Sequence, residues 1–182
     1  MNTDSPRILF FSDAHGVVPA LQALRRRVDA DAPDLVCFLG DALYHGPRNG
    51  IPGEYDPQRA AGEFNALAER IVAVRGNCDA EIDQCLLSFP MLGDYATVVA
   101  GGRRILLSHG HLYGPDATLP PLPAGSLVAT GHTHVPVIRR VGELVCFNPG
   151  SISLPKGGSV PSYALLDGAD LTLRRLSDGA PL

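Results

Sequence analysis

Three short apolar runs in the first half of the chain, separated by helical patterns, constrain the fold more than any other feature. The runs cover residues 8–11, 35–39 and 72–74, and every position in them is apolar. A continuous apolar run is typical of a strand that is covered on both faces. Because helical segments separate the runs, this order favours a parallel sheet with right-handed crossovers.

Two helices are predicted between these strands. The first begins near Pro19, which suits the first turn of a helix, and its apolar residues recur three and four positions apart. The second covers residues 57–70, with Asp56 as its N-cap. Weaker helical patterns occur at residues 80–87 and 116–119.

The second half of the chain has a different pattern. Gly101 and Gly102 separate two β-type segments at residues 95–100 and 103–108, which predicts a hairpin with a two-residue turn. Further short strands are expected at residues 127–130, 135–141, 144–147, 163–166 and 171–176. The sequence has no internal repeat and no clear linker, so we expect residues 1–182 to form a single domain.

Composition narrows the function classes. The net charge is −4, and no block of like charges indicates a groove for a long nucleic acid. No stretch reaches the ~18 apolar residues that a membrane span needs, and the N-terminus resembles no signal peptide. The four cysteines lack CxxC spacing, which favours reduced thiols over a disulfide framework. We therefore expect a cytoplasmic protein that does not bind membranes.

Polar clusters follow the predicted strands at five places. Each contains Asp, Asn or His, usually next to glycine, and the carboxyl ends of strands are where ligands bind in open α/β sheets. Residues two apart in an extended segment point to the same side, so each Asp-x-His or His-x-His pair can face one centre. The candidate metal ligands are Asp13, His15, Asp41, Asn77, His109, His132 and His134.

The chemistry of this set narrows the choice of metal. Oxygen and imidazole ligands without thiolate favour Mn, Fe, Ni, Zn or Mg over copper(I) or an iron–sulfur cluster. Seven ligands exceed what one ion requires. Two divalent ions that share a bridging carboxylate are therefore expected, as in other hydrolytic sites.

The ordered motifs DxH, GD, GNxD, HGH and GHTH resemble those of the calcineurin-like metallophosphoesterase superfamily. The segments HGPRN, VRGNCD, FNPGS and PKGG are similar to the smaller bacterial YfcE-type phosphodiesterases. The resemblance covers residues 7 to about 176. It implies an α/β fold: a four-layer α/β/β/α sandwich of two mixed β-sheets flanked by helices.

The resemblance also implies how the ligands divide between the two ions, with Mn²⁺ the first expectation for both. Asp41 would bridge them. The first ion would be held by Asp13, His15, Asp41 and His134, and the second by Asp41, Asn77, His109 and His132. A hydroxide bridging the ions would attack the phosphorus of a small phosphodiester.

Other residues are candidates for catalysis or substrate binding. Asn77 can direct its amide NH₂ towards phosphate. In the wider superfamily the third position of GNxD is commonly His, a candidate general acid, whereas this chain has Cys78. A thiol with a pKa of ~8.5 is a poorer acid at neutral pH, so His111 or His45 is an alternative proton donor. In the long loop after residue 41, Arg48 and His45 are candidates for substrate binding.

Three functions remain open at this stage. The leading one is a metal-dependent phosphodiesterase, a phosphoric diester hydrolase that acts on small diesters. The same binuclear centre supports a phosphomonoesterase. A catalytically silent scaffolding module of the same fold is the third, although such a module is expected to lack one or more ligands, and all seven are present. Homo-oligomers formed through exposed strand edges are a further expectation.

Overall fold

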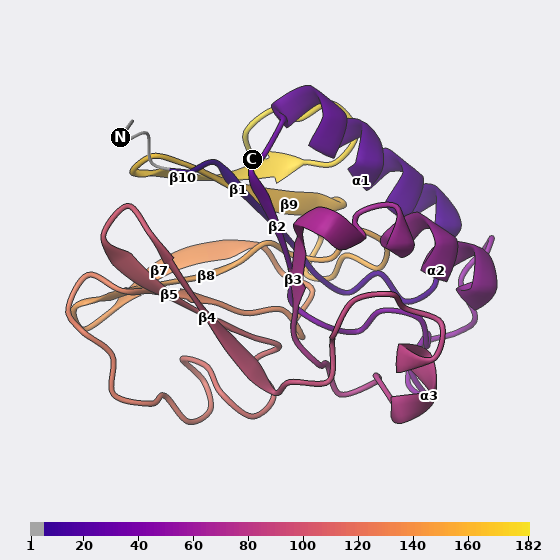
Figure 1. The fold of residues 1–182 in the computed structure, drawn as a ribbon, viewed down its shortest axis with the longest axis horizontal. Coiled ribbons are helices and arrows are strands. Elements are labelled where there is room, and N and C mark those ends of the chain that lie inside the picture. The colour runs from indigo at the N-terminus through magenta and orange to yellow at the C-terminus, as the bar shows by residue number, and fades with distance from the viewer. Residues whose placement is uncertain (1–5) are drawn as a thin grey trace.

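The computed structural model describes residues 6–182, which form two five-stranded sheets packed face to face, with helices on the outer side of one of them (Figure 1). Residues 1–5, part of the segment in which we expect no signal peptide, lie outside the described residues. Both sheets contain parallel and antiparallel pairs, so the expected α/β sandwich of two mixed sheets is confirmed.

The first sheet has the strand order β10-β9-β1-β2-β3. Its parallel part contains the three apolar runs identified in the sequence, and an antiparallel pair from the end of the chain extends it beyond β1. The strands are β1 (Ile8–Phe11), β2 (Leu35–Phe38), β3 (Ile71–Ala73), β9 (Ser162–Asp167) and β10 (Asp170–Arg175).

Helices cover the outer face of this sheet (Figure 1). The longest is α1 (Val18–Asp31), and Pro19 lies in its first turn as predicted. In α2 (Pro57–Asn65) the Asp56 carboxylate accepts a hydrogen bond from the backbone N–H of Arg59, so the predicted N-cap is confirmed. The helix ends earlier than expected, and a 3₁₀ turn, η1 (Ala68–Arg70), completes the segment.

The second sheet has the strand order β4-β5-β6-β8-β7. Gly101 and Gly102 join its first two strands, and both have positive φ, as a tight hairpin turn requires. The predicted hairpin is therefore confirmed. The strands are β4 (Tyr95–Ala100), β5 (Arg103–Ser108), β6 (Leu127–Ala129), β7 (Val137–Val141) and β8 (Leu144–Asn148).

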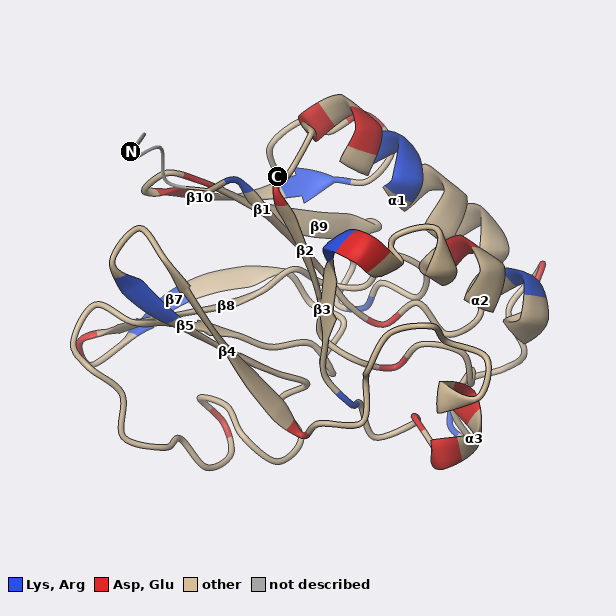
Figure 2. Cartoon of the chain, viewed as in Figure 1, with Lys and Arg blue, Asp and Glu red and all other residues tan. Residues whose placement is uncertain are grey.

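Side-chain alternation along the strands divides the apolar residues between two cores. Leu9 and Phe11 of β1 face the helices, whereas Ile8 and Phe10 face the second sheet. Phe10 packs edge-on against Phe147 of β8, with ring centroids 5.0 Å apart. Strands β2, β3 and β8 carry no charged residue, which Figure 2 shows as uninterrupted tan. Apolar side chains from both sheets therefore form one shared core.

The outer face of the second sheet differs from the expected helical layer. Within residues 6–182 no helix follows α3 (Glu81–Gln84), and a long loop covers this face instead. The helix expected at residues 116–119 is wrong, because this segment forms turns beside three prolines, at positions 120, 121 and 123. The helix expected over residues 80–87 is confirmed only as the single turn α3. None of the described helices is long and apolar enough to span a membrane.

The contact between the sheets predicts a large effect of truncation. Phe10→Ala should lower the free energy of unfolding by about 3–5 kcal/mol, because it removes a fully buried ring from between the sheets. Urea denaturation with a chelator present measures this without a contribution from bound metal. Val99→Ala, at a side chain 72% exposed on β4, is the control and should change stability by less than about 0.5 kcal/mol. Equal effects of the two variants would contradict the assigned interior.

Candidate metal centre

The five polar clusters follow strands of both sheets. Asp13 follows β1, and its backbone N–H donates to the carbonyl of Gly40 after β2. In the second sheet, the backbone N–H of Gly131 after β6 donates to the carbonyl of His109 after β5. Because each sheet fixes its own loops in this way, the ligand side chains meet where the two sheets end.

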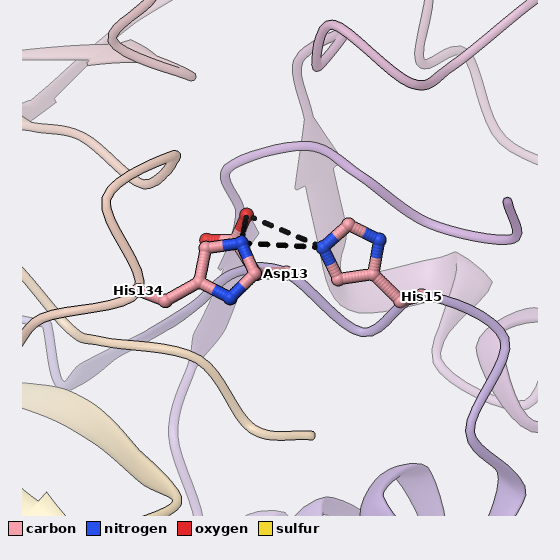
Figure 3. Close-up of side chains that lie close together, drawn as sticks. All are labelled: Asp13, His15 and His134. Carbon is pink, nitrogen blue, oxygen red and sulfur yellow. Dashed lines mark hydrogen bonds and ion pairs between the residues drawn. The ribbon is translucent and has the colours of Figure 1, made fainter. Parts of the chain in front are cut away.

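Asp13, His15 and His134 form the first ligand group (Figure 3). The His134 Nε2 lies 3.3 Å from Asp13 Oδ1, and the His15 Nε2 lies 3.8 Å from the same oxygen. The two Nε2 atoms are 3.4 Å apart. All three side chains are buried, and they come from loops of both sheets.

The second group lies next to the first. Asp41 Oδ2 is 3.4 Å from His109 Nε2, which is in turn 3.0 Å from Asn77 Oδ1. The His132 ring lies beside that of His109, with centroids 5.1 Å apart. Asp41 Oδ2 is also 3.7 Å from His15 Nε2 of the first group. One carboxylate therefore contacts both groups.

Backbone carbonyls orient three of the imidazoles. The Nδ1–H of His15 donates to the carbonyl of Tyr44, that of His109 to Leu39 and that of His134 to Leu154, at 2.6–2.8 Å. A carbonyl oxygen only accepts, so each Nδ1 carries the proton and each Nε2 faces the site. This arrangement is the usual one for a histidine that binds a metal through Nε2.

A divalent cation fits these groups. Asp13 Oδ1 is buried and has no hydrogen-bond partner, although a buried carboxylate oxygen without one is costly. The Nε2 lone pairs of His15 and His134 face each other, which is unfavourable between neutral rings. A cation between these atoms satisfies all three at once, and carboxylate with imidazole is a common ligand set for Mn, Fe, Ni and Zn.

The electrostatics of the site point to the same need for positive charge. Burial lowers the pKa of His109, but hydrogen bonding to Asp41 and the charges of Asp13 and Asp41 outweigh it and raise this pKa to about 9. Burial also raises the pKa of Asp41, yet His109 and the Cys78 N–H hold it below its usual range. A proton on His109 thus compensates the buried carboxylates, and a bound cation would replace it.

Most of the ligand residues adopt a left-handed backbone conformation. Positive φ is rare outside glycine, although Asp and His tolerate it better than most residues. Such conformations cluster at functional sites, where the surrounding structure holds them in place. Five of the seven predicted ligands have φ between 48° and 70°, namely Asp13, His15, Asp41, His132 and His134.

Asp79 connects two of the ligand loops. Its carboxylate accepts hydrogen bonds from the backbone N–H groups of Asp41, Ala42 and Gly76, at 2.7–2.8 Å. Gly76 fits because a side chain at this position would collide with Asp41. Asp79 is the last residue of the GNxD motif, but the spacing of the motif does not predict what this aspartate does. Its three acceptor contacts indicate that Asp79 positions Asp41 and the Asn77 loop.

The last loop of the chain supports the first ligand group. The hydroxyls of Ser151 and Ser153 both donate to the backbone carbonyl of Asp13 at 2.8 Å. The side-chain amide of Asn148 donates to the carbonyl of Gly131, which precedes the His132–His134 segment. The segment from Asn148 to Ser153 therefore supports the backbone of both loops that carry the first ligand group.

The candidate substrate residues are placed in different surroundings. Arg48, Asn77 and Cys78 line a cleft of about 140 Å³ beside His15, Asp41, His132 and His134, and Lys156 lines it too. Instead of lining this cleft, His45 packs edge-on against Tyr55 with ring centroids 5.3 Å apart. His111 lies 6.1 Å from His132 between ring centroids and lines a neighbouring pocket with it.

The chain matches one known protein family over most of its length. The family described as the calcineurin-like phosphoesterase superfamily domain matches residues 7–170. The chain belongs to this family. Divalent metal ions are therefore implied by the family together with the clustered ligands.

Similar proteins of this superfamily are known from bacteria and beyond. The chain is 42% identical to phosphodiesterase YfcE of Escherichia coli strain K12 over 94% of its own length and 93% of that protein. The solved structure of E. coli YfcE, described as a phosphoesterase, superimposes with a TM-score of 0.93 at 41% identity and covers 97% of this chain and 96% of that one. The probable metallophosphoesterase YsnB of Bacillus subtilis is 30% identical over 87% of this chain and 82% of that protein.

The fold also occurs in proteins that are more distant. Zinc-bound Vps29 of Entamoeba histolytica has a TM-score of 0.60 at 22% identity and covers 96% of this chain and 94% of that one. At this level of identity the likeness concerns the fold alone, so the function has to be argued from the site.

The contacts of Asp79 predict its effect on metal binding. Asp79→Asn should weaken Mn²⁺ binding by about 10- to 100-fold, because one acceptor oxygen becomes an NH₂ group that faces backbone donors. Isothermal titration calorimetry measures the affinity. The matched control is Asp83→Asn, which alters a half-buried carboxylate that accepts a hydrogen bond from Ala80 N–H at 2.8 Å but none from a predicted metal ligand. Unchanged affinity in Asp79→Asn would show that the ligand loops need no such support.

Proposed function

We propose that this chain is a metal-dependent phosphodiesterase that hydrolyses small phosphodiesters at a binuclear centre. The observation that carries the proposal is the position of Asp41, whose carboxylate lies within 3.7 Å of imidazole nitrogens of both ligand groups. A carboxylate in this position suits a bridging ligand. The 42% identity to a protein named phosphodiesterase YfcE supports a diester substrate.

The proposed ligand sets are those that the motifs imply. Asp13, His15, Asp41 and His134 would hold the first cation, and Asp41, Asn77, His109 and His132 the second. We propose Mn²⁺ as the native metal. Divalent cations bound there would lower the pKa of coordinated water and neutralise the charge of the phosphate.

Residues of the cleft would bind and orient the ester. Asn77 donates its side-chain amide to Cys78 Sγ while its oxygen faces His109, so its NH₂ group lies on the open side of the site. The guanidinium of Arg48 suits a phosphate oxygen because it presents several donors in one plane. The cleft that these residues line measures about 140 Å³ and opens beside the predicted ligands.

Two alternatives receive less support. A phosphomonoesterase could use the same centre, and only the likeness to YfcE argues for the diester. A scaffolding module has no need for buried carboxylates and imidazoles, whereas this chain keeps Asp13 fully buried with an oxygen that has no protein partner.

The cellular location, the domain organisation and the oligomeric state of the chain are also proposals. All four cysteines are free thiols, as expected in a reducing cytoplasm. The shared interior between the sheets supports a single domain over residues 1–182. Exposed Val137 and Ile138 on the edge strand β7 are a candidate surface for a homo-oligomer.

Metal removal tests the proposed reaction. With Mn²⁺ present, the protein should hydrolyse bis-p-nitrophenyl phosphate faster than p-nitrophenyl phosphate. A chelator should abolish both activities, and added Mn²⁺ should restore them. Activity that survives complete removal of metal would overturn the mechanism, and faster turnover of the monoester would favour the phosphomonoesterase.

A pair of aspartate variants locates the chemistry. Asp41→Ala should lower kcat/KM for the diester by at least about 100-fold, because it removes the carboxylate that contacts both ligand groups. Asp29→Ala removes an exposed carboxylate from α1 and should leave the activity unchanged. Metal content, measured by elemental analysis, should fall only in Asp41→Ala.

Cys78 occupies the position of the GNxD motif at which the wider superfamily commonly has a histidine, but its thiol is unsuited to act as a general acid. Burial, together with the negative charge of Asp41, raises the pKa of Cys78 to about 12. A group with such a pKa donates a proton poorly at neutral pH. His111 is the proposed alternative donor, and its buried Nδ1 has no protein partner. We therefore propose that esters with good leaving groups react best.

Restoring a histidine should change the preference among esters. Cys78→His should raise the rate for alkyl phosphodiesters relative to aryl ones by about 10-fold or more, because alkyl leaving groups gain most from a proton donor. Metal content should stay the same. Cys78→Ser is the matched control without a suitable pKa. An unchanged ratio of alkyl to aryl rates in Cys78→His would refute the proposed deficit.

A further inference from the structure

Lys156 is the only lysine in the chain, and it lies in the cleft of the metal centre. The sequence has 15 Lys and Arg residues, and all the others are arginine. Arginine prefers planar, bidentate contacts, whereas lysine presents a compact charge on a flexible stem. Lys156 is thus the one lysine among these basic residues, and it lines the cleft of the candidate metal centre.

The backbone fixes the loop of Lys156 against a metal-ligand residue. The Lys156 N–H donates to the carbonyl of His134 at 3.1 Å, and two residues earlier the Leu154 carbonyl accepts from the His134 ring at 2.6 Å. The Lys156 carbonyl in turn accepts from the Ser159 N–H at 3.1 Å. The loop that carries Lys156 is therefore hydrogen-bonded to both the backbone and the ring of His134.

Lys156 and Arg48 both line the cleft. Lys156 lies beside the first ligand group, because its backbone N–H donates to the carbonyl of His134. Over the described residues 6–182, neither cation forms an ion pair with a carboxylate. Both positive charges are therefore available to a ligand.

The charge balance of the site exceeds what a simple diester can neutralise. This argument rests on the proposed binuclear function. Two divalent cations carry four positive charges, of which Asp13 and Asp41 compensate two, and Arg48 and Lys156 add two more. A phosphodiester and one hydroxide bring two negative charges. The buried Asp79 carboxylate, which accepts a hydrogen bond from the Asp41 N–H, compensates one more, so one positive charge stays uncompensated.

We propose that Lys156 binds a second anionic group of the substrate, so that the preferred substrate is a small phosphodiester that carries an additional phosphate. This phosphate would lie on the side of the first ligand group, beyond the ester that is cleaved. A phosphate monoester carries nearly two negative charges at pH 7, which is enough to compensate this remaining charge. A charge-assisted contact of this kind adds specificity as well as affinity.

A matched pair of chromogenic esters tests the proposal. Thymidine 5′-(p-nitrophenyl phosphate) is a diester, and its 3′-phosphorylated form differs only by the additional phosphate. The wild-type protein with Mn²⁺ should prefer the 3′-phosphorylated ester by about 10-fold in kcat/KM. Lys156→Ala should remove most of this preference, and Lys156→Arg should retain part of it. Arg26→Ala, at an exposed arginine on α1, should retain it fully.

A second measurement does not depend on turnover. Because Lys156 is the only lysine, an amine-reactive acetylating reagent has one side-chain target, and mass spectrometry of the peptide around residue 156 reports its modification. Thymidine 3′,5′-bisphosphate should protect Lys156 from acetylation at least about 5-fold better than thymidine 5′-monophosphate at equal saturation.

The outcomes separate this inference from the proposed function. If the wild-type protein hydrolyses neither ester, the phosphodiesterase function fails. If it hydrolyses both with equal kcat/KM, or if Lys156→Ala lowers both rates by the same factor, the binding of a second phosphate is overturned and the diesterase stands. Equal protection by the two nucleotides would also overturn it.

Discussion

The contact of the Asp41 carboxylate with imidazoles of both ligand groups is the interaction on which the rest of the site depends. His109 lies after β5 of the second sheet, whereas Asp41 and His15 follow strands of the first, so the contact crosses the sandwich. Asp79 and the Cys78 N–H hold the Asp41 loop in place. Without this carboxylate, two sets of buried nitrogens and oxygens would be neighbours with no shared partner.

Packing between the sheets gives this contact its precision. Apolar side chains from both sheets pack together in the interior, where Phe10 contacts Phe147 across the sandwich. Close-packed interiors resist deformation, so they hold the loops at the strand ends in a single arrangement. That rigidity also maintains the left-handed conformations at Asp13, Asp41 and three of the histidines, each of which has an energetic cost. The core thus holds strained residues in place, although these residues lie in loops outside it.

The sequence was sufficient to predict the strands and the residues that gather around the metal centre, because both follow from local patterns. Apolar runs identify buried strands, and their polar ends must meet once the strands are parallel. The role of Asp79 could not be predicted in this way, since it depends on a contact between loops that are distant in the chain. The helix expected at residues 116–119 failed because prolines that follow it favour turns, and the layer it was to form is a loop.

The ligand residues lower the stability of the folded chain, and this free-energy cost explains why the presence of all seven is informative about function. A carboxylate that is fully buried, as Asp13 is, destabilises the folded chain unless a positive charge compensates it, and burial accordingly raises its pKa. Neutral imidazoles with facing nitrogens and left-handed ligand residues add to that cost. A chain that served only as a scaffold would become more stable by replacing any of these residues. All seven are present in this chain, and divalent cations bound to the folded state would compensate the buried carboxylates and stabilise that state through their affinity.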